Sequence, residues 1–441
     1  EPSSIFEITA STPTARPAEI KTYYASVSLP IGITPPREFE YSIPQHLAGA
    51  LKPGSLVNVP FHGGSRWACV STVSDKPVFV GKHQPILNII ALPTTLQDYI
   101  GAVAGFLSSQ YIATWAQSVQ TALPVRLFLG NRRPGFPGRA NPWIHTAQGR
   151  NKIDLSIAQQ GAWQSIRDSY GTTKKPVYLW GPTGSGKSFV LLKFMSELIA
   201  QGKGSIYLVP EIALTPQFAR MFAEQLPDGA RIAIWSSKTP EAAKRGIYEA
   251  LLASTIDAVL GTRSAIFLPM KDLGAIIIDE EQDSSFKQET PSPAYHARDV
   301  ALWRVGHQSA IAIFASATPS LECYSMMQEN IMLKAKIAGR YGNAGMPTIR
   351  VTKLYRPQHP VNRDVIDAIK ETVEAGGQAL VFHNRRGFVR TLCCQACGKY
   401  VDCTRCDLPL TLHNTDDGSK RLKCHHCGLR KNVPTACPDC G

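Results

Sequence analysis

The stretch GPTGSGKS, residues 181–188, constrains the fold of this chain more than any other. It lies between the apolar runs 177–180 and 189–192, a pattern that predicts a strand, a glycine-rich turn and a helix. Glycines let such a turn curl until its backbone N–H groups face a polyphosphate, and a chance Gly/Ser turn would rarely carry every fixed position in this context. Lys187 would add a positive charge near the outer phosphates, and Ser188 would offer a hydroxyl to Mg²⁺. We therefore predict a nucleotide site formed by Gly181, Thr183, Gly184, Ser185, Gly186, Lys187 and Ser188.

A second nucleotide signal is the string IIIDEEQ, residues 276–282. Its apolar part predicts a buried strand that ends in acidic side chains. Asp279 is placed to hold Mg²⁺, directly or through water, and Glu280 to polarise the attacking water. Alone the string is weak evidence, because many strands end in acids. About 90 residues after a phosphate-binding loop, it predicts a hydrolytic site in which Lys187, Asp279 and Glu280 are catalytic.

Apolar runs alternate with helical stretches from about residue 155 to 347, which predicts a mostly parallel sheet covered by helices. Its expected strands are 177–180, 205–209, 231–235, 257–260, 275–278 and 311–315. Before it, short β-branched and aromatic runs predict a small barrel-like domain with strands at 23–29, 39–43, 55–59 and 67–73, followed by a helical stretch at 95–123. After a hinge-like loop at 341–347, a helix near 362–375 and a strand at 379–382 would begin another α/β unit.

The chain is basic, since 47 Lys and Arg against 34 Asp and Glu give a net charge of +13. This excess favours a polyanionic partner, nucleic acid first, over a basic protein without such a role. The segment 125–152 contains several basic residues and no acidic one. For this segment a solvated linker is slightly favoured over a basic strap that contacts phosphates. The chain has no apolar run of about 18 residues and no signal-peptide pattern, so no membrane partner is expected. Because it lacks an initiator Met and stops abruptly at Gly441, it is expected to be a piece of a longer protein, or only the ordered part of one.

The turn GTRSA, residues 261–265, also follows an expected strand. Thr262 and Arg263 would present a hydroxyl and a guanidinium there, which are groups that bind phosphate. An ordinary β-turn with a solvated arginine is about equally compatible with these residues.

Four CxxC pairs lie between residues 393 and 441. Two thiolates separated by two residues can bind one ion, and two such pairs complete a tetrahedral sulfur site. We therefore predict two structural Zn²⁺ sites, which leave no open position for catalysis, with Cys393, His425 and His426 as non-ligands. The predicted ligands are Cys394, Cys397, Cys403, Cys406, Cys424, Cys427, Cys437 and Cys440.

Further motifs occur in a characteristic order: PEIALTPQ (210–217), GTRSA (261–265), DEEQDSSFKQ (279–288), YHARD (295–299), SATPSLE (316–322) and NRRGF (384–388). With the phosphate-binding loop and the Cys pairs, they resemble the PriA family of replication-restart helicases, the primosomal N′ proteins of helicase superfamily 2. The resemblance covers nearly all of residues 23–441. It implies an α/β fold in which a RecA-like P-loop helicase lobe with a parallel sheet follows a small β-rich DNA-binding domain. A partial second lobe with a two-zinc Cys-rich subdomain would follow that lobe.

The corresponding segments are a flexible tail (1–22), a β-rich domain that binds DNA 3′ ends (23–124), a basic linker (125–152), the ATP-binding lobe 1 (153–345), the start of lobe 2 (346–392) and the zinc subdomain (393–441).

The resemblance implies an ATP-dependent 3′→5′ DNA helicase that recognises stalled or abandoned forks and initiates primosome assembly. ATP, Mg²⁺ and two Zn²⁺ ions would be its cofactors. Its partners would be forked and single-stranded DNA, single-stranded DNA-binding protein and helicase-loading proteins, at the bacterial nucleoid in the cytoplasm.

The resemblance also assigns individual residues. Gln159, in LSIAQ, would read adenine, Phe39, Glu40 and Tyr41 would hold a DNA 3′ end, and Thr262 with Arg263 would contact DNA. The loop 283–295 would couple single-strand binding to hydrolysis. The family's zinc pairing is nested, which puts the first and last Cys pairs on one ion and the two middle pairs on the other.

Three departures from the family stand out. Gln282 replaces a usual His, about 30 residues leave no room for the family's winged-helix domain, and the later motifs of lobe 2 would lie beyond Gly441. They keep a second possibility open, a fork-binding scaffold that binds DNA, ATP and zinc without unwinding. A restriction or repair translocase of the same superfamily is disfavoured by the Cys pairs.

Overall fold

The computed structural model describes residues 22–31, 37–129, 141–149, 153–340, 348–352, 361–382, 390–394, 396–406, 408–414, 419–424 and 427–441. The chain forms two compact units, Glu1–Met346 and Pro347–Gly441. Four predictions fall outside the described residues: the tail up to residue 21, the hinge-like loop 341–347, the NRRGF motif at 384–388, and the two histidines at 425–426.

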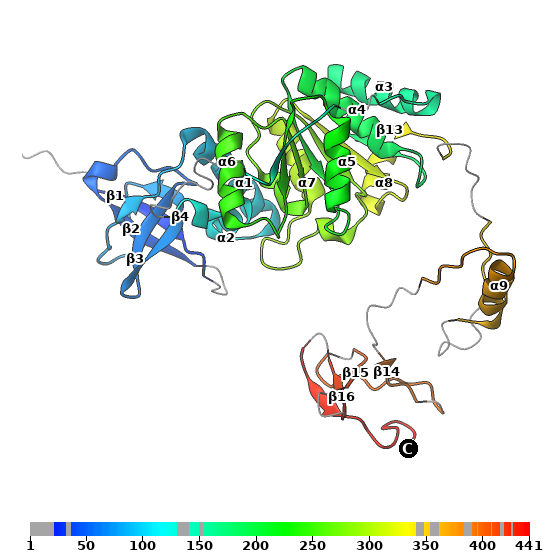
Figure 1. The fold of residues 1–441 in the computed structure, drawn as a ribbon. Coiled ribbons are helices and arrows are strands. Elements are labelled where there is room, and N and C mark those ends of the chain that lie inside the picture. The colour runs from blue at the N-terminus through cyan, green and yellow to red at the C-terminus, as the bar shows by residue number, and fades with distance from the viewer. Residues whose placement is uncertain are drawn as a thin grey trace, which may run out of the picture. The chain divides into compact units, whose positions relative to one another are not determined.

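The first unit begins with a five-stranded antiparallel sheet in the order β2-β1-β4-β3-β5 (Figure 1). Alternating residues of its strands face a small core that contains Val27, Val57, Val59 and Val70. The four predicted strands are confirmed, and a short fifth one adds to them. The bounds are β1 Tyr23–Ser28, β2 Glu38–Ile43, β3 Leu56–Phe61, β4 Gly64–Ser74 and β5 Asn88–Ile89, with the short helix η1 Gln45–Leu47.

Two helices, α1 Thr94–Tyr111 and α2 Trp115–Ala122, fill the stretch predicted to be helical. α1 ends at Ile112, whose left-handed φ of 50° stops the helix. α2 starts at a capping box in which the Thr114 hydroxyl accepts from the Gln117 N–H and the Gln117 side chain accepts from the Thr114 N–H. A turn of 3₁₀ helix, η2 Val125–Leu127, follows.

An eight-stranded sheet in the order β13-β7-β12-β11-β8-β10-β9-β6 forms the centre of the lobe. Its neighbouring strands are parallel except for β6, which runs antiparallel to β9 at one edge. All six predicted strands are confirmed within one or two residues. The bounds are β6 Ile144–Thr146, β7 Val177–Trp180, β8 Gly204–Leu208, β9 Arg231–Trp235, β10 Ala258–Gly261, β11 Leu273–Asp279, β12 Ile311–Ser316 and β13 Leu333–Lys336.

β6 corrects part of the expected linker, since residues 144–146 lie inside the basic stretch 125–152. Ile144 pairs with Ala233 and Thr146 with Arg231, so this stretch supplies the last strand of the sheet. Basic composition predicted a linker, but a three-residue strand at a sheet edge needs only backbone pairing and one apolar side chain. The Pro and Gly residues behind the expectation lie at 134–138, outside the described residues.

Helices cover both faces of this sheet (Figure 1), because its strands are apolar on both sides. Alternation divides each strand between two cores: Tyr178 and Ile278 face one of them, Leu179 and Ile277 the other. The first core includes residues of α6, α7 and α8, and the second includes residues of α3, α4 and α5. The bounds are α3 Ile157–Gly171, α4 Lys187–Ala200, α5 Pro216–Gln225, α6 Glu241–Leu252, η3 Arg263–Phe267, η4 Ser284–Phe286, α7 Ala297–His307 and α8 Leu321–Gln328.

The N-terminal domain and the lobe share the first of these cores. Phe106 of α1 stacks on Trp303 of α7 with ring centroids 4.9 Å apart. The Tyr99 hydroxyl donates to the Phe267 carbonyl oxygen at 3.1 Å. Apolar burial therefore continues from the small sheet through α1 and α2 into the lobe.

The second unit contains α9 Arg363–Glu374 and a four-stranded antiparallel sheet in the order β14-β15-β16-β17. The predicted helix is confirmed, but the strand predicted at 379–382 is wrong. Leu380 is 94% exposed and Phe382 83%, and no described strand pairs with them, so their apolar pattern lacks the neighbour that a strand needs. The bounds are β14 Arg390–Thr391, β15 Thr411–Asn414, β16 Lys420–Lys423 and β17 Arg430–Asn432.

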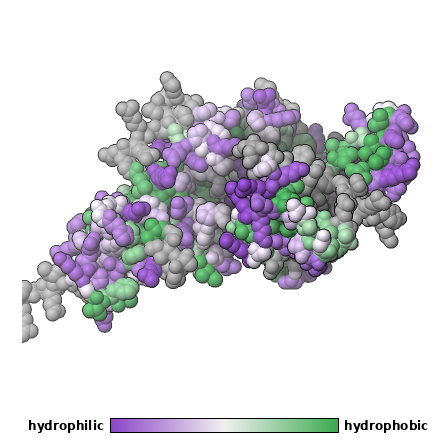
Figure 2. Space-filling model, turned by 90° about the horizontal axis from the view of Figure 1, so that it is seen from below, coloured by the Kyte–Doolittle hydropathy of each residue, from purple (hydrophilic) through white to green (hydrophobic). Residues whose placement is uncertain are grey.

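Among the described residues, no helix has both the length and the apolar character needed to cross a bilayer. On the face drawn in Figure 2, hydrophilic residues and small hydrophobic groups are interspersed.

Candidate nucleotide and zinc sites

The phosphate-binding loop connects β7 to α4, as the sequence predicted. Gly186, the residue before α4, has a φ of +78°, and a Cβ there would lie 2.2 Å from Nε2 of Gln159. Only glycine fits this backbone without strain or collision. The loop therefore curls tightly around the start of α4, where free N–H groups favour an anion.

Two side chains of the loop, those of Lys187 and Ser185, could donate hydrogen bonds to a phosphate. Nζ of Lys187 donates to the carbonyl oxygens of Gly181 at 3.0 Å and Pro182 at 3.4 Å, and the residue is 7% exposed. The Ser185 hydroxyl is buried and has no hydrogen-bond partner in the part of the chain that the structure describes. A buried hydroxyl without a partner is costly, so the loop fits a ligand that supplies acceptor oxygens.

Asp279 lies at the end of β11 and faces this loop. Its Oδ2 accepts from the Ser188 hydroxyl at 3.2 Å and from the Tyr207 hydroxyl at 2.6 Å, and its Oδ1 accepts from the Glu280 N–H at 3.0 Å. Burial raises the pKa of Asp279 above its ordinary value, and the hydrogen bond from Tyr207 partly offsets this. A carboxylate beside a hydroxyl is an oxygen donor set of the kind that Mg²⁺ takes.

Glu280 follows in a left-handed conformation, with a φ of +52°. One carboxylate oxygen accepts from Nε2 of Gln282 at 2.9 Å. A left-handed glutamate is strained and persists only where its surroundings fix it, which is common at functional sites. The structure thus brings Lys187, Ser188, Asp279 and Glu280 to one edge of the sheet.

Gln159 lies beside the loop, and both the oxygen and the nitrogen of its side-chain amide make hydrogen bonds within the protein. Its Oε1 accepts from the Ser156 N–H at 2.9 Å in a capping box, and its Nε2 donates to the Ser185 carbonyl oxygen at 3.0 Å. The side chain would have to exchange partners to read adenine, so that role stays a prediction.

Tyr207 is the residue of this site that the sequence did not indicate. It lies in an apolar run, and its ring packs on Phe222 with centroids 5.2 Å apart, as a core residue does. Its link to Asp279 depends on β8 being the neighbour of β11, and strand order is not visible in the sequence.

Thr262 and Arg263 begin the turn after β10. The Arg263 guanidinium donates to the carbonyl oxygens of Ser285 at 3.0 Å and Lys287 at 2.7 Å, and to Oε1 of Gln288 at 3.2 Å. Thr262 is 7% exposed. Arg263 therefore fixes the loop that follows Asp279 and Glu280 in the chain. Contact of Thr262 or Arg263 with DNA stays a prediction.

The proposed 3′-end residues lie on β2, with Phe39 and Tyr41 on one face and Glu40 on the other. Phe39 packs edge-on against Phe61 with centroids 5.3 Å apart, beside a cavity of about 620 Å³ that Glu40 and Tyr41 also line. The Glu40 carboxylate, 2% exposed, accepts from the N–H groups of residues 78 and 79 at 2.9–3.1 Å and contacts Nε2 of His83 at 2.8 Å. Burial raises the pKa of Glu40, but these hydrogen bonds more than offset it and leave the pKa below its ordinary value. The carboxylate is thus occupied within the domain, and its contact with a DNA end stays a prediction.

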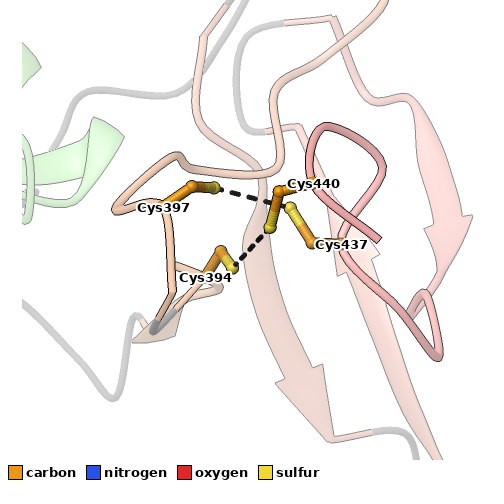
Figure 3. A group of neighbouring side chains, drawn as sticks. All are labelled: Cys394, Cys397, Cys437 and Cys440. Atoms are coloured by element: carbon orange, nitrogen blue, oxygen red, sulfur yellow. Dashed lines mark hydrogen bonds between the residues drawn. The ribbon is translucent and has the colours of Figure 1, made fainter.

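Eight cysteines form two groups of four in the second unit. One consists of Cys394, Cys397, Cys437 and Cys440 (Figure 3), the other of Cys403, Cys406, Cys424 and Cys427. Within each group all sulfur atoms lie within 4.8 Å of one another. This is the nested arrangement that the family resemblance implied.

The sulfur geometry fits zinc and not disulfides. Cys394 and Cys440 have their sulfurs 3.6 Å apart, and Cys397 and Cys437 3.7 Å (Figure 3). A tetrahedral Zn(Cys)₄ site needs about 3.8 Å, whereas a disulfide needs about 2.05 Å. The N–H groups of Cys397 and Ala396 lower the pKa of the Cys394 thiol to about 6, whereas the hydrogen bond with Cys394 raises the pKa of the Cys440 thiol to about 12.

Three family models match the chain. They describe a DEAD/DEAH box helicase at residues 157–326, a 3′ DNA-binding domain of PriA at 26–124, and the Cys-rich region of the PriA DNA helicase at 403–431.

Curated relatives agree with these matches, and each carries the name replication restart protein PriA. The Bacillus subtilis protein is 35% identical over 65% of this chain and 36% of its own length. Those of Treponema pallidum and Rickettsia conorii are 31% and 30% identical, over 92% and 94% of this chain and 60% and 61% of their own lengths.

The chain therefore spans between 36% and 61% of the length of these three relatives. Among solved structures, RecG bound to a three-way DNA junction is similar at 21% identity with a TM-score of 0.38, over 52% of this chain and 29% of that one. The matched domains, their order and the two Cys₄ groups agree in one assignment: the chain belongs to the PriA family of replication restart proteins.

Proposed function

We propose that this protein is an ATP-dependent 3′→5′ DNA helicase that recognises stalled or abandoned replication forks and initiates primosome assembly. The observation that carries the proposal is the approach of Ser188 to Asp279, 3.2 Å between their oxygens, with Glu280 next in the chain. This pairing supports a Mg²⁺-ATP site in a chain that also matches a 3′ DNA-binding domain.

The residues divide the chemistry of ATP hydrolysis. Lys187 exchanges the carbonyl oxygens of Gly181 and Pro182 for phosphate oxygens and offsets their charge. Ser188 and Asp279 would hold Mg²⁺, which when bound neutralises charge that develops on the phosphates. Glu280 orients the attacking water once its carboxylate leaves Gln282.

DNA binding is proposed from charge and shape together. The net charge of +13 supports contacts with phosphates, and the cavity beside Phe39 and Phe61 offers aromatic rings to a terminal base. The two zinc sites would shape the second unit for protein contacts, because closed Cys₄ sites leave no position for catalysis. The partners would be single-stranded DNA-binding protein and helicase-loading proteins, in the bacterial cytoplasm near the nucleoid.

The experiment compares DNA-stimulated ATP hydrolysis by this chain and by a longer form of the protein. Glu280→Gln should keep ATP affinity and lower kcat at least a hundredfold, since the water loses its orienting group. Glu249→Gln, an exposed glutamate on α6, is the matched control and should leave kcat unchanged. If the longer form binds ATP but never hydrolyses it on forked DNA, the helicase proposal fails.

A second candidate function is a fork-binding scaffold of the same family. The hydrogen bond from Gln282 to Glu280 favours it, because an occupied carboxylate is a poorer partner for water. The scaffold predicts tight fork binding, ATP binding and two zinc ions without unwinding. DNA-stimulated ATP hydrolysis by the unaltered protein separates the two, since an enzyme hydrolyses ATP on forked DNA and the scaffold binds ATP without hydrolysing it.

The 3′-end cavity is tested with forks whose nascent strand ends in a 3′-hydroxyl or in a blocked 3′ end. Phe39→Ala should weaken binding to the hydroxyl fork by at least fivefold, as expected when a stacking ring is lost. Val73→Ala is the control, since Val73 is an apolar residue of the same sheet, 38% exposed and outside the cavity. Equal losses on both forks would contradict the proposed end recognition.

A further inference from the structure

The acidic turn after β11 carries a third carboxylate, which the proposed hydrolysis does not use. Asp279 faces the phosphate-binding loop and Tyr207, whose ring belongs to the core on one side of the sheet. Glu281 is 1% exposed and contacts Tyr178, whose ring belongs to the core on the other side. The core that contains Tyr178 is the one that the lobe shares with the N-terminal domain.

Glu281 joins the turn to three other elements. Its Oε1 accepts from the Ser320 hydroxyl at 2.6 Å and from Nη1 of Arg298 at 3.3 Å. Its Oε2 accepts from the Tyr178 hydroxyl at 3.2 Å and from the Ser320 N–H at 3.3 Å. These donors belong to β7, to α7 and to the N-cap of α8. Four donors on one buried carboxylate hold it in a single orientation.

Arg298 is the cation of this cluster and is 6% exposed. Besides Glu281, its guanidinium donates to the Ser320 hydroxyl at 3.3 Å and pairs with Asp299 at 3.4 Å and Glu322 at 3.5 Å. A buried charge is tolerated only when it is paired in this way. Its N–H donates to Nδ1 of His296, which caps α7.

Tyr111, the last residue of α1, extends the cluster into the N-terminal domain. Its hydroxyl donates to Oδ2 of Asp299 at 2.8 Å and accepts from the His296 N–H at 3.2 Å. Burial raises the pKa of Tyr111, so the hydroxyl keeps its proton. A continuous set of hydrogen bonds therefore leads from α1 through Asp299 and Arg298 to Glu281.

We propose that Glu281 and Arg298 are positioning residues that hold Glu280 in place, and that Tyr111 makes this position depend on the docked N-terminal domain. Glu280 has a strained left-handed backbone, so the residues beside it must fix it. Glu281 does so with its side chain and with its own N–H, which donates to the Ala315 carbonyl oxygen at 3.1 Å. The proposal rests on the proposed hydrolytic role of Glu280.

The test compares two variants that each remove one hydroxyl from α1 at the same domain interface. Tyr111→Phe breaks the link to Asp299 and His296. Tyr99→Phe breaks the bond to the Phe267 carbonyl oxygen, which has no part in the cluster. Both keep their rings and should fold, so the pair separates the cluster from domain docking.

The first readout is amide hydrogen exchange, which does not depend on activity. In Tyr111→Phe, exchange in peptides covering 279–283 and 318–322 should accelerate about fivefold, as expected from one lost hydrogen bond. Tyr99→Phe should leave both peptides unchanged. The inference is overturned if Tyr111→Phe leaves exchange unchanged there, or if both variants accelerate it equally.

The second readout is the kinetics of DNA-stimulated ATP hydrolysis. Tyr111→Phe should lower kcat about threefold to tenfold with an unchanged KM for ATP, because the phosphate-binding loop is untouched. A raised KM with an unchanged kcat would contradict the positioning role. If the unaltered protein never hydrolyses ATP, the proposed function fails, and the exchange experiment still decides whether the cluster positions the turn.

Discussion

The hydrogen bond between Tyr207 and Asp279 allows a quantitative prediction about metal-nucleotide binding. Tyr207→Phe removes one hydroxyl that lies 2.6 Å from Oδ2 of Asp279. The ring stays, and so do its contacts with Phe222, at 5.2 Å between centroids, and Phe218, at 6.5 Å. The variant therefore changes the environment of one carboxylate and little else.

The size of the effect follows from the strength of that bond. A hydrogen bond to a charged group contributes about 1.5–3 kcal/mol, and one pKa unit corresponds to about 1.4 kcal/mol. Burial already raises the pKa of Asp279 above 3.8, and Tyr207 opposes that shift. Without the hydroxyl, the pKa of Asp279 should rise further, because the hydrogen bond from Tyr207 is the largest contribution that lowers it.

The assay is the affinity for a Mg²⁺-bound, non-hydrolysable ATP analogue as a function of pH. Protonated Asp279 cannot hold Mg²⁺, so affinity should fall on the acid side, and Tyr207→Phe should move that fall to higher pH. Tyr178→Phe is the control, because its hydroxyl bonds to Glu281 on the opposite side of the sheet. The reasoning is refuted if Tyr207→Phe has an unshifted acid limb, or if Tyr178→Phe shifts it equally.

Three further predictions concern stability, metal content and the loop. Asp279→Asn should raise the Tm of the ligand-free protein at pH 7.5, because ionising a carboxyl whose pKa is raised by burial costs stability above that pKa. The gain should fade in a series of thermal melts as the pH falls below that pKa. Cys440→Ser should lower the zinc content measured by elemental analysis from two ions to one, whereas Cys393→Ser, outside both groups, should keep two. Gly186→Ala should weaken ATP binding at least tenfold by calorimetry, since its Cβ would meet Gln159 at 2.2 Å in a left-handed backbone; unchanged affinity would contradict the loop geometry.

The amino-acid sequence predicted those elements and sites that are encoded in a short run of neighbouring residues. The strand before Gly181, the acidic end of β11 and the CxxC pairs each follow from a short run of residues, and the structure places them as expected. Two predictions failed, the strand at 379–382 and the linker that includes residues 144–146. Whether either segment forms a strand depends on a pairing partner elsewhere in the chain, which the segment's own sequence does not show. One lacked a pairing strand, and the other gained β9 as a partner.

Some residues of the candidate nucleotide site could be predicted from the sequence, and others could not. Asp279 and Glu280 could be found because acidic residues end an apolar strand. Tyr207 could not, since an aromatic residue in a buried strand has the same pattern whether or not its hydroxyl has a partner. The cluster around Arg298 depends on α7 packing beside the acidic turn, which is a long-range contact without a spacing of its own.

The core shared by the N-terminal domain and the lobe also bears on how the protein unfolds. Leu107 of α1 and Val300 of α7 belong to the same buried cluster and are fully buried. Cutting the chain between these segments would leave apolar surface on both pieces, although they belong to two different family domains, at residues 26–124 and 157–326. We expect one cooperative thermal transition for both segments, and poor solubility for a lobe produced without α1 and α2.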